Sequence, residues 1–466
     1  MRIRVFHHYV HAPIWILALI ETGVFFASIY AGAQLRFIED YGSGIAQLGP
    51  LYPRAVVLTL TMFVVLTSMG LYRADMKLED RSYNSLFVTS FAIGFIAITA
   101  IFYIFPTLYL GRGVLGIAFV LAFIASATVR YIFVKAQDSE ITKRRVLVLG
   151  AGSRAARIAE IANSNTGDNR FHLVGFAACG ALDNSIDKSL LLPKDAPLVA
   201  LAKKHNVDEI VVGLRQRRGG SLNMDELLEC RMEGIRVIDL SSFFERETGK
   251  VQLDSLNPSW MVYCDGFSRS DIRNVVKRMF DVSVSTALLV LTLPVMILTA
   301  IIVKLESSGP VLYRQRRLGE CGQPFDVLKF RSMRADAEID GKPQWAKKDD
   351  NRITRIGRVI RRLRIDELPQ LFNVIKGDMS FVGPRPERPY FVNKFINDIP
   401  YYLTRHSVKP GITGWAQVRY PYGSSVEDAR QKLQYDLYYA KNHTLFLDLV
   451  ILFETAQVVF LGKGVR

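Results

Sequence analysis

The chain has 466 residues, of which 50% are hydrophobic, and a formal net charge of +15. Nearly continuous apolar segments fill residues 1–135, whereas residues 140–260 have the pattern of a soluble α/β domain, so a single soluble domain is excluded. The positive charge is concentrated between Arg314 and Arg364, where it reaches a net +8. Such a patch suits nucleic acid, anionic lipid or phosphorylated substrates. The neighbouring apolar segments argue against a nucleic-acid partner.

The four cysteines are widely spaced and show no paired metal-ligand spacing, and the histidines do not cluster with them. We therefore expect free thiols in a reducing compartment and no zinc site.

Four apolar runs are each close to the ~20 residues that cross a hydrocarbon core. Basic residues flank them in a pattern that places the N-terminus, the loop between runs two and three, and everything after run four on the cytoplasmic side. Glu21 is the single acidic residue within these runs, and we interpret it as a packing or interfacial residue. The runs cover residues 13–35, 51–71, 85–106 and 113–134.

A β-rich segment at residues 145–149 leads into Gly150-Ala151-Gly152-Ser153-Arg154-Ala155, the G-x-G-x-x-A form of a dinucleotide loop. Later strands at 173–178, 209–212 and 236–238 complete a Rossmann-like pattern. The second strand ends at Cys179-Gly180, where an acid would meet a ribose. We therefore expect no bound cofactor and a regulatory or structural role.

Another apolar run, residues 282–303, has Pro294 at its middle. Since proline removes a helical hydrogen bond and clashes with the preceding turn, we expect a break there. A full crossing would place the following basic region outside the cell, against the positive-inside rule. The pattern therefore favours a re-entrant helix, at about 280–305, over a fifth crossing.

The basic region has two features that suit phosphate and membrane. Period-two alternation puts Lys329 and Arg331 on one face of a strand, where two cations suit a diphosphate. Ile356, Val359 and Ile360 then form an apolar stripe on an arginine-rich helix, which is suited to an anionic membrane surface.

Asp366-Glu367 ends this helix and precedes a second apolar stripe. Asp is a favoured N-cap, and Glu complements the helix dipole, so a structural role is sufficient by itself. The same position also keeps a carboxylate ionised and nucleophilic.

Several motifs in order resemble the bacterial sugar transferases known as polyprenyl-phosphate hexose-1-phosphate transferases. The resemblance covers residues 275–461 most strongly, and the four apolar runs and Rossmann-like segment upstream resemble the large monotopic branch. The motifs are residues 363–373 (LRIDELPQLFN), 376–386 (KGDMSFVGPRP), 409–418 (KPGITGWAQV) and 435–439 (YDLYY).

This resemblance implies that hexose 1-phosphate passes from a UDP-hexose to undecaprenyl phosphate through a phosphosugar-aspartyl intermediate, in the initiation of surface polysaccharide synthesis. Asp366 would be the nucleophile. Glu367 would help to hold Mg²⁺, with Asp436 as a second acidic candidate. Substrate would be bound by Lys329, Arg331, Arg385, Arg388 and Gln417.

The expected fold is an N-terminal membrane α-helical bundle, a Rossmann-like α/β domain, and an α/β monotopic catalytic domain with a re-entrant membrane helix. The expected limits are residues 1–139, 140–250 and 273–466, with a linker at 251–272. The protein is expected to be a multi-pass protein of the bacterial inner membrane, with its catalytic domain on the cytoplasmic face of the lipid bilayer. A homodimer is plausible by resemblance alone.

Two other function classes stay open. One is a catalytically inactive membrane scaffold or sensor, against which the intact Asp366, Glu367 and Arg385 argue. The other is an NAD-dependent nucleotide-sugar dehydratase. A Tyr-x-x-x-Lys pair at a usable place after the glycine loop is missing from the sequence, which disfavours the dehydratase.

Overall fold

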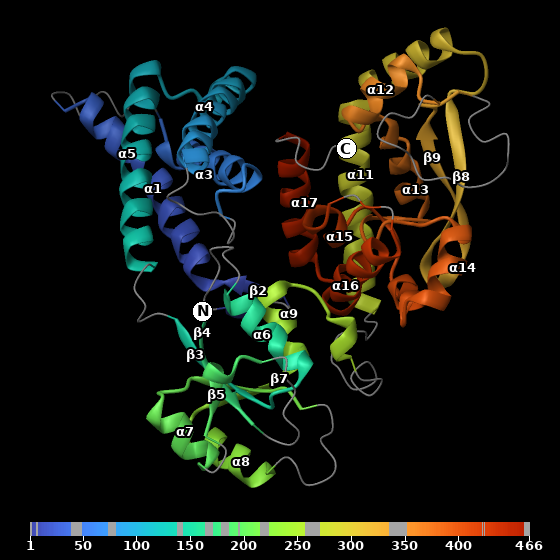
Figure 1. The fold of residues 1–466 in the computed structure, drawn as a ribbon. Helices are drawn as coiled ribbons and strands as arrows, with labels where there is room; N and C mark the ends of the chain where they lie inside the picture. The colour runs from blue at the N-terminus through green and yellow to red at the C-terminus, as the bar shows by residue number, and fades with distance from the viewer. Residues whose placement is uncertain are drawn as a thin grey trace. The chain divides into compact units, whose positions relative to one another are not determined.

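A computed structural model describes most of the chain, in two compact units (Figure 1). The boundary between the units lies inside helix α9 (Leu240–Thr248), between Phe243 and Phe244. The described residues are 2–5, 8–38, 49–72, 81–137, 143–163, 171–178, 186–193, 196–214, 223–256, 271–334, 352–421, 423 and 425–460.

The four N-terminal apolar runs all form helices, as predicted. They pack side by side around a shared core that includes Phe25, Leu58, Ile98 and Ala118 (Figure 1). By length and composition these four and α11 below are able to cross a membrane. The elements are β1 (Arg2–Val5), β2 (His8–His11), α1 (Ala12–Arg36), α3 (Leu51–Ser68), α4 (Arg81–Ile104), the 3₁₀ turn η1 (Pro106–Leu108) and α5 (Arg112–Gln137).

The middle of the chain forms a parallel five-stranded sheet in the order β5-β4-β3-β6-β7, with the G-x-G-x-x-A loop between β3 and α6. Helices α7 and α8 pack together on one face, and α6 lies on the other (Figure 1). The predicted α/β pattern is confirmed, while Cys179 and Gly180 lie outside the described residues. The elements are β3 (Arg144–Leu149), α6 (Ser153–Asn163), β4 (Phe171–Ala177), η3 (Lys188–Leu190), β5 (Leu191–Leu192), α7 (Leu198–Lys204), β6 (Glu209–Val212), α8 (Met224–Met232) and β7 (Arg236–Asp239).

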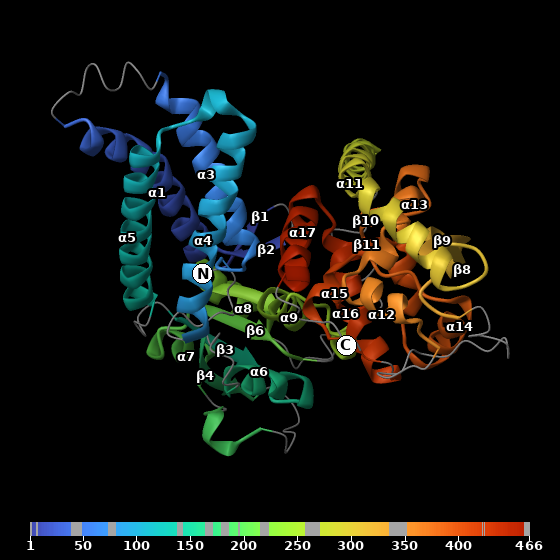
Figure 2. The same ribbon diagram turned by 90° about the horizontal axis from the view of Figure 1, so that it is seen from above.

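In the second unit, helices surround a short parallel pair of strands, β10 and β11. Strands β8 and β9 form an antiparallel hairpin in the same unit (Figure 2). Its elements are η4 (Leu253–Ser255), α11 (Asp271–Glu306), β8 (Leu312–Leu318), η5 (Glu320–Gly322), β9 (Pro324–Phe330), α12 (Arg355–Arg362), η6 (Ile365–Glu367), α13 (Gln370–Lys376), β10 (Ser380–Val382), α14 (Pro389–Asp398), η7 (Tyr402–Ser407), β11 (Gly411–Thr413), α15 (Trp415–Arg419), α16 (Val426–Asn442) and α17 (Leu445–Phe460).

Residues just after α9 belong to the core of this unit. Val251, Leu253 and Leu256 are buried against α16 and α17 residues, and the Val251 amide donates to the Gln434 carbonyl at 3.0 Å. Part of the predicted linker therefore packs as core, whereas the predicted domain limits themselves stay predictions.

Helix α11 is continuous from Asp271 to Glu306 and contains Pro294, so the proline does not end the helix. Its ribbon changes direction along its length (Figures 1 and 2). Each half contacts a different helix. Near the start, Arg278 donates to the Val374 and Ile375 carbonyls at the end of α13, whereas Met296 and Val303 pack with Ile360 of α12. The helix therefore links the two helices that flank η6.

The contact between β10 and β11 depends on glycine, and we expect Gly411→Ala to destabilise the second unit. A Cβ at Gly411 would lie 2.0 Å from the Gly383 amide nitrogen, which is backbone and cannot turn away as a side chain could. Overpacking of this kind costs about 1–3 kcal/mol. Thermal unfolding in detergent would measure the loss. Gly152→Ala, which meets nothing within 4 Å, is the control, and an unchanged midpoint for Gly411→Ala would contradict the close approach.

Candidate active site

The local fold around Asp366 and Glu367 differs from the predicted N-cap. Helix α12 has Thr354 as its N-cap and Leu363 as its C-cap, and Arg364 then adopts a left-handed conformation with φ 59°. Asp366 and Glu367 follow in the 3₁₀ turn η6, and the N-cap of α13 is Pro369. Asp366 is therefore not an N-cap, and the structural alternative considered for it does not hold. The left-handed residue redirects the chain, and both carboxylates line a cavity instead.

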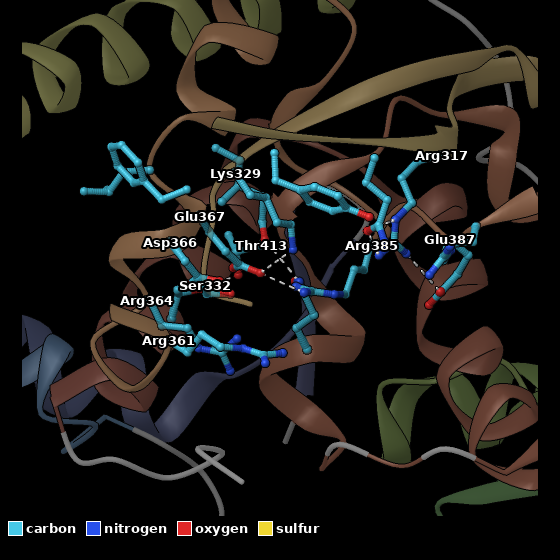
Figure 3. Close-up of a pocket in the computed structure, with 18 of the residues that line it drawn as sticks. Arg317, Lys329, Ser332, Arg361, Arg364, Asp366, Glu367, Arg385, Glu387 and Thr413 are labelled. Carbon is cyan, nitrogen blue, oxygen red and sulfur yellow. Dashed lines mark hydrogen bonds and ion pairs between the residues drawn. The ribbon is translucent and has the colours of Figure 1, made fainter. Parts of the chain in front are cut away.

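This cavity of about 680 Å³ lies within the second unit and is rich in cations (Figure 3). It is lined by charged side chains from the hairpin, α12, η6 and the loop after β10, and by apolar residues that include Leu288, Phe381 and Val458. A space of this size, lined by both charged and apolar groups, suits a ligand that has both phosphate and hydrocarbon parts.

Glu367 connects two of the predicted substrate-binding cations. Its Oε1 accepts from Arg385 Nη2 at 2.7 Å and lies 3.3 Å from Lys329 Nζ (Figure 3). Burial acts to raise the pKa of Glu367, but Arg385 and Lys329 outweigh it and hold that pKa well below its usual value. Glu367 is therefore ionised, and burial lowers the pKa of Lys329 beside it.

Asp366 lies next to Glu367, but its pKa is shifted in the opposite direction. Its residue is 8% exposed, and burial together with the charge of Glu367 raises its pKa, against the opposing effect of Lys329 and Arg361. No hydrogen bond to its carboxylate is seen among the described residues, although the side chain lines the cavity. A carboxylate that is poorly solvated and not paired is a better nucleophile than one neutralised by a cation.

Arg331 and Lys329 line the same cavity, which agrees with their predicted position on one face of a strand. Arg331 lies one residue after the end of β9, and its side chain is held by a different partner. Its Nη2 donates to the carbonyl and the hydroxyl of Ser307 at 2.7 and 2.8 Å. Its buried Nη1 has no hydrogen-bond partner among the described residues.

Arg388 and Gln417 also line the cavity, so all five predicted substrate-binding residues meet there. Arg388 is the N-cap residue of α14. Gln417 donates to the Ile412 carbonyl at 3.1 Å, and its buried Oε1 has no partner in the described part of the chain. Their roles stay predictions, because proximity alone does not assign them.

Asp436 is held differently from the expected metal ligand. It is 2% exposed on α16, and its Oδ2 lies 2.8 Å from Arg405 Nη2. Burial raises its pKa to about 6, although Arg405 acts to lower it. Its ion-pair partner in the structure is Arg405, on the 3₁₀ helix η7.

Several cavity residues were missed by sequence reasoning. Arg361 and Arg364 belong to the arginine-rich segment predicted to suit a membrane surface, but both line the cavity close to Asp366 (Figure 3). Arg317 lies across the cavity on β8, and burial lowers its pKa to about 10. The sequence does show many arginines that lie outside the apolar stripe of helix α12. Periodicity does not show which of these arginines face a cavity.

Glu367 is the cavity carboxylate that would hold a magnesium ion, together with oxygens of the substrate. Mg²⁺ is commonly held by one or two carboxylates and by substrate phosphates. Glu367 Oε1 receives both cations, and no hydrogen bond to its Oε2 is seen among the described residues. No group of three or more His, Cys, Asp or Glu side chains suited to a metal occurs in that part of the chain. Asp436, buried against Arg405, fits poorly as a ligand.

Comparison with known proteins identifies the family. Residues 272–462 match the family model described as bacterial sugar transferase. Over 196 residues, 41% of this chain and 91% of the relative, the chain is 39% identical to an uncharacterised sugar transferase of Bacillus subtilis (strain 168). The chain belongs to the bacterial sugar transferase family. The matched residues of this sugar transferase include the whole cavity, and the predicted resemblance is confirmed.

Two longer alignments extend the comparison. Over 240 residues, 52% of this chain and 56% of the relative, the sugar transferase is 43% identical to a UDP-N-acetylgalactosamine-undecaprenyl-phosphate N-acetylgalactosaminephosphotransferase of Aeromonas hydrophila. Over 322 residues, 67% of this chain and 58% of the relative, it is 34% identical to an undecaprenyl-phosphate glucose phosphotransferase of Komagataeibacter xylinus. The chain thus spans less than two thirds of the length of these two relatives. With its candidate membrane-crossing helices, this sugar transferase is a membrane protein.

Proposed function

We propose that this sugar transferase moves a sugar 1-phosphate from a UDP-sugar to undecaprenyl phosphate. The sugar is a hexose or an N-acetylhexosamine. The observation that carries the proposal is the adjacent pair in η6. Glu367 is neutralised by Lys329 and Arg385, while Asp366 faces the cavity without such a partner. The names of the relatives supply the two substrate classes, and the cations supply the means to bind phosphate.

In the proposed reaction, a carboxylate oxygen of Asp366 attacks the phosphorus attached to the sugar. The bond from that phosphorus to the bridging oxygen breaks, and UMP leaves with the oxygen. A phosphate oxygen of undecaprenyl phosphate then attacks the same phosphorus and releases the Asp366 carboxylate. The bond between sugar carbon and oxygen is never broken, so the anomeric configuration is retained.

Lys329, Arg331 and Arg385 neutralise the diphosphate and the charge that develops as UMP departs. A magnesium ion held by Glu367 would add positive charge at the phosphate oxygens. Glu367 also keeps Lys329 and Arg385 together before substrate binds, since both lie within 3.3 Å of its Oε1. The cations are thus already arranged when the diphosphate arrives.

Membrane placement follows the same reasoning. We infer that α11 enters and leaves one leaflet through its bend, since a full crossing would put the cavity on the side away from cytoplasmic UDP-sugars. Exposed apolar residues on the C-terminal half of the helix, such as Leu291, Leu298 and Leu305, support contact with lipid. The inner membrane with the cavity on its cytoplasmic face is the setting that supplies both substrates.

The proposed function is tested by UMP release from purified protein with Mg²⁺, undecaprenyl phosphate and, in turn, UDP-glucose, UDP-galactose and UDP-N-acetylgalactosamine. We expect release that depends on the lipid phosphate and is strongest with one donor. Folded protein that releases no UMP with any of them would contradict the proposal and favour an inactive scaffold.

The pH dependence of the first step should report Asp366. Only the ionised carboxylate attacks, and its pKa is raised by burial and by Glu367, so single-turnover UMP release should rise with pH through a pKa above the ordinary 3.8. Lys329 opposes this rise in the pKa. Lys329→Met should therefore move the acid limb to higher pH. The control, Lys409→Met, removes a cation outside the cavity and should leave the acid limb where it is. Equal pH profiles for the wild type, Lys329→Met and Lys409→Met would contradict the assignment of this limb to Asp366.

A further inference from the structure

The loop after β10, residues 384–387, has all four of its backbone carbonyls engaged. Two accept from backbone amides: the Pro384 carbonyl from Gly411, and the Glu387 carbonyl from Leu318, both at 3.0 Å. This arrangement fixes the two ends of the segment to β11 and β8. The middle two carbonyls depend on side chains instead.

Both of those side chains are arginines with little solvent exposure. Arg405 Nη2 donates to the Arg385 carbonyl at 2.9 Å, and Arg317 Nη1 donates to the Pro386 carbonyl at 2.9 Å. The Arg385 side chain itself is 34% exposed and reaches Glu367 at 2.7 Å. The backbone of Arg385 is thus tied down while its guanidinium faces the cavity.

Arg405 is in turn held from two sides. Its Nη1 donates to the Tyr402 hydroxyl at 2.8 Å, and its Nη2 lies 2.8 Å from Asp436 Oδ2. Both side chains of the ion pair are almost fully buried. A rigid planar guanidinium with a fixed counter-ion has one orientation, in which it also meets the Arg385 carbonyl.

We propose that Arg405 and Asp436 are positioning residues for Arg385. Asp436 fixes Arg405, and Arg405 fixes the backbone from which the Arg385 guanidinium reaches Glu367 and the substrate phosphates. This inference rests on the proposed function for its catalytic consequence, although the positioning itself is a property of the fold. It gives Asp436 a role that needs no metal.

The positioning is tested first by hydrogen–deuterium exchange of the full-length protein, which needs no activity. Arg405→Met and Asp436→Asn should speed exchange of the amides in residues 381–388. The matched control is Glu245→Gln, which breaks another buried ion pair of α16, between Lys441 and Glu245 at 2.7 Å, outside the cavity. Unchanged exchange at 381–388 in both site variants would overturn the proposal.

The catalytic consequence is tested by the kcat and KM of UMP release. Misplacement by about 1 Å costs on the order of 10²-fold, and we expect that loss in kcat for Arg405→Met and Asp436→Asn. In an Arg385→Ala background, Arg405→Met should cost no more than about 2-fold further, because the residue acts through Arg385. Losses that multiply instead would show direct action on substrate and overturn the proposal.

Two further comparisons keep the outcomes separate. Because Arg405→Met risks unfolding by leaving Asp436 without its cation, Arg405→Lys serves as the milder variant, which keeps the charge but loses the fork. Arg405→Lys should also speed amide exchange in residues 381–388. If the wild-type protein releases no UMP, the proposed function fails, whereas the exchange result still decides the positioning.

Discussion

Asp366→Asn should abolish UMP release while leaving the protein folded. The amide is isosteric but lacks the negative charge that attacks phosphorus, and loss of a nucleophile typically costs roughly 10⁴-fold or more. Asp366 lies in a short 3₁₀ turn and has no partner among the described residues, so its replacement breaks no visible ion pair. Steady-state UMP release, with far-UV circular dichroism as a check of folding, would measure the effect.

The control for this substitution is Asp398→Asn, on an exposed acid at the end of α14 and outside the cavity. It should leave UMP release within about 2-fold of wild type, because surface substitutions away from a site are usually near neutral. Folded Asp366→Asn that kept wild-type turnover would contradict the role of Asp366 as nucleophile.

The largest effect on stability is expected at Glu21 and Arg130, in the N-terminal helical bundle. Glu21 of α1 is 0% exposed and receives Arg130 Nε and Nη2 of α5 at 2.6 and 2.7 Å. The Tyr72 hydroxyl donates to the same carboxylate at 2.6 Å, and Arg130 also bonds to the Tyr83 hydroxyl. The interpretation of Glu21 as a packing residue is therefore confirmed, and it acts through an ion pair.

Removing one partner leaves a buried charge uncompensated, which costs about 3–5 kcal/mol. Arg130→Met and Glu21→Gln should each lower the unfolding midpoint in detergent strongly. The double variant Glu21→Leu/Arg130→Met should recover much of the loss, since replacing both ions by apolar groups is often neutral. Arg112→Met, at an exposed position of α5, is the control; single variants as stable as this control would contradict the account.

The sequence predicted the elements whose pattern is local. The apolar runs gave α1, α3, α4 and α5, and the strands around the glycine loop gave the parallel sheet. The motifs also named Asp366 and Glu367, which prove to line one cavity with Lys329 and Arg385. Hydrophobic period and motif order are sufficient for this, because both are read along the chain.

Contacts between distant residues could not be predicted in this way. Glu21 meets Arg130 across 109 positions, and Arg405 meets Asp436 from a different helix. The left-handed Arg364 was also missed, because non-glycine residues rarely adopt this conformation and no local signal requires it. Asp366 and Glu367 follow this residue in a 3₁₀ turn that lines the cavity, and Asp366 is not the N-cap of α13.

The most direct test of the central claim is isotope exchange between labelled UMP and unlabelled UDP-sugar in the absence of undecaprenyl phosphate. Attack by Asp366 retains sugar phosphate on the protein and frees UMP, so the first step alone can run backwards with added UMP. We predict label in the UDP-sugar with wild type and none with Asp366→Asn. Wild-type protein that completes transfer when lipid phosphate is added, yet shows no exchange without it, would contradict the covalent intermediate and require direct attack by the lipid phosphate.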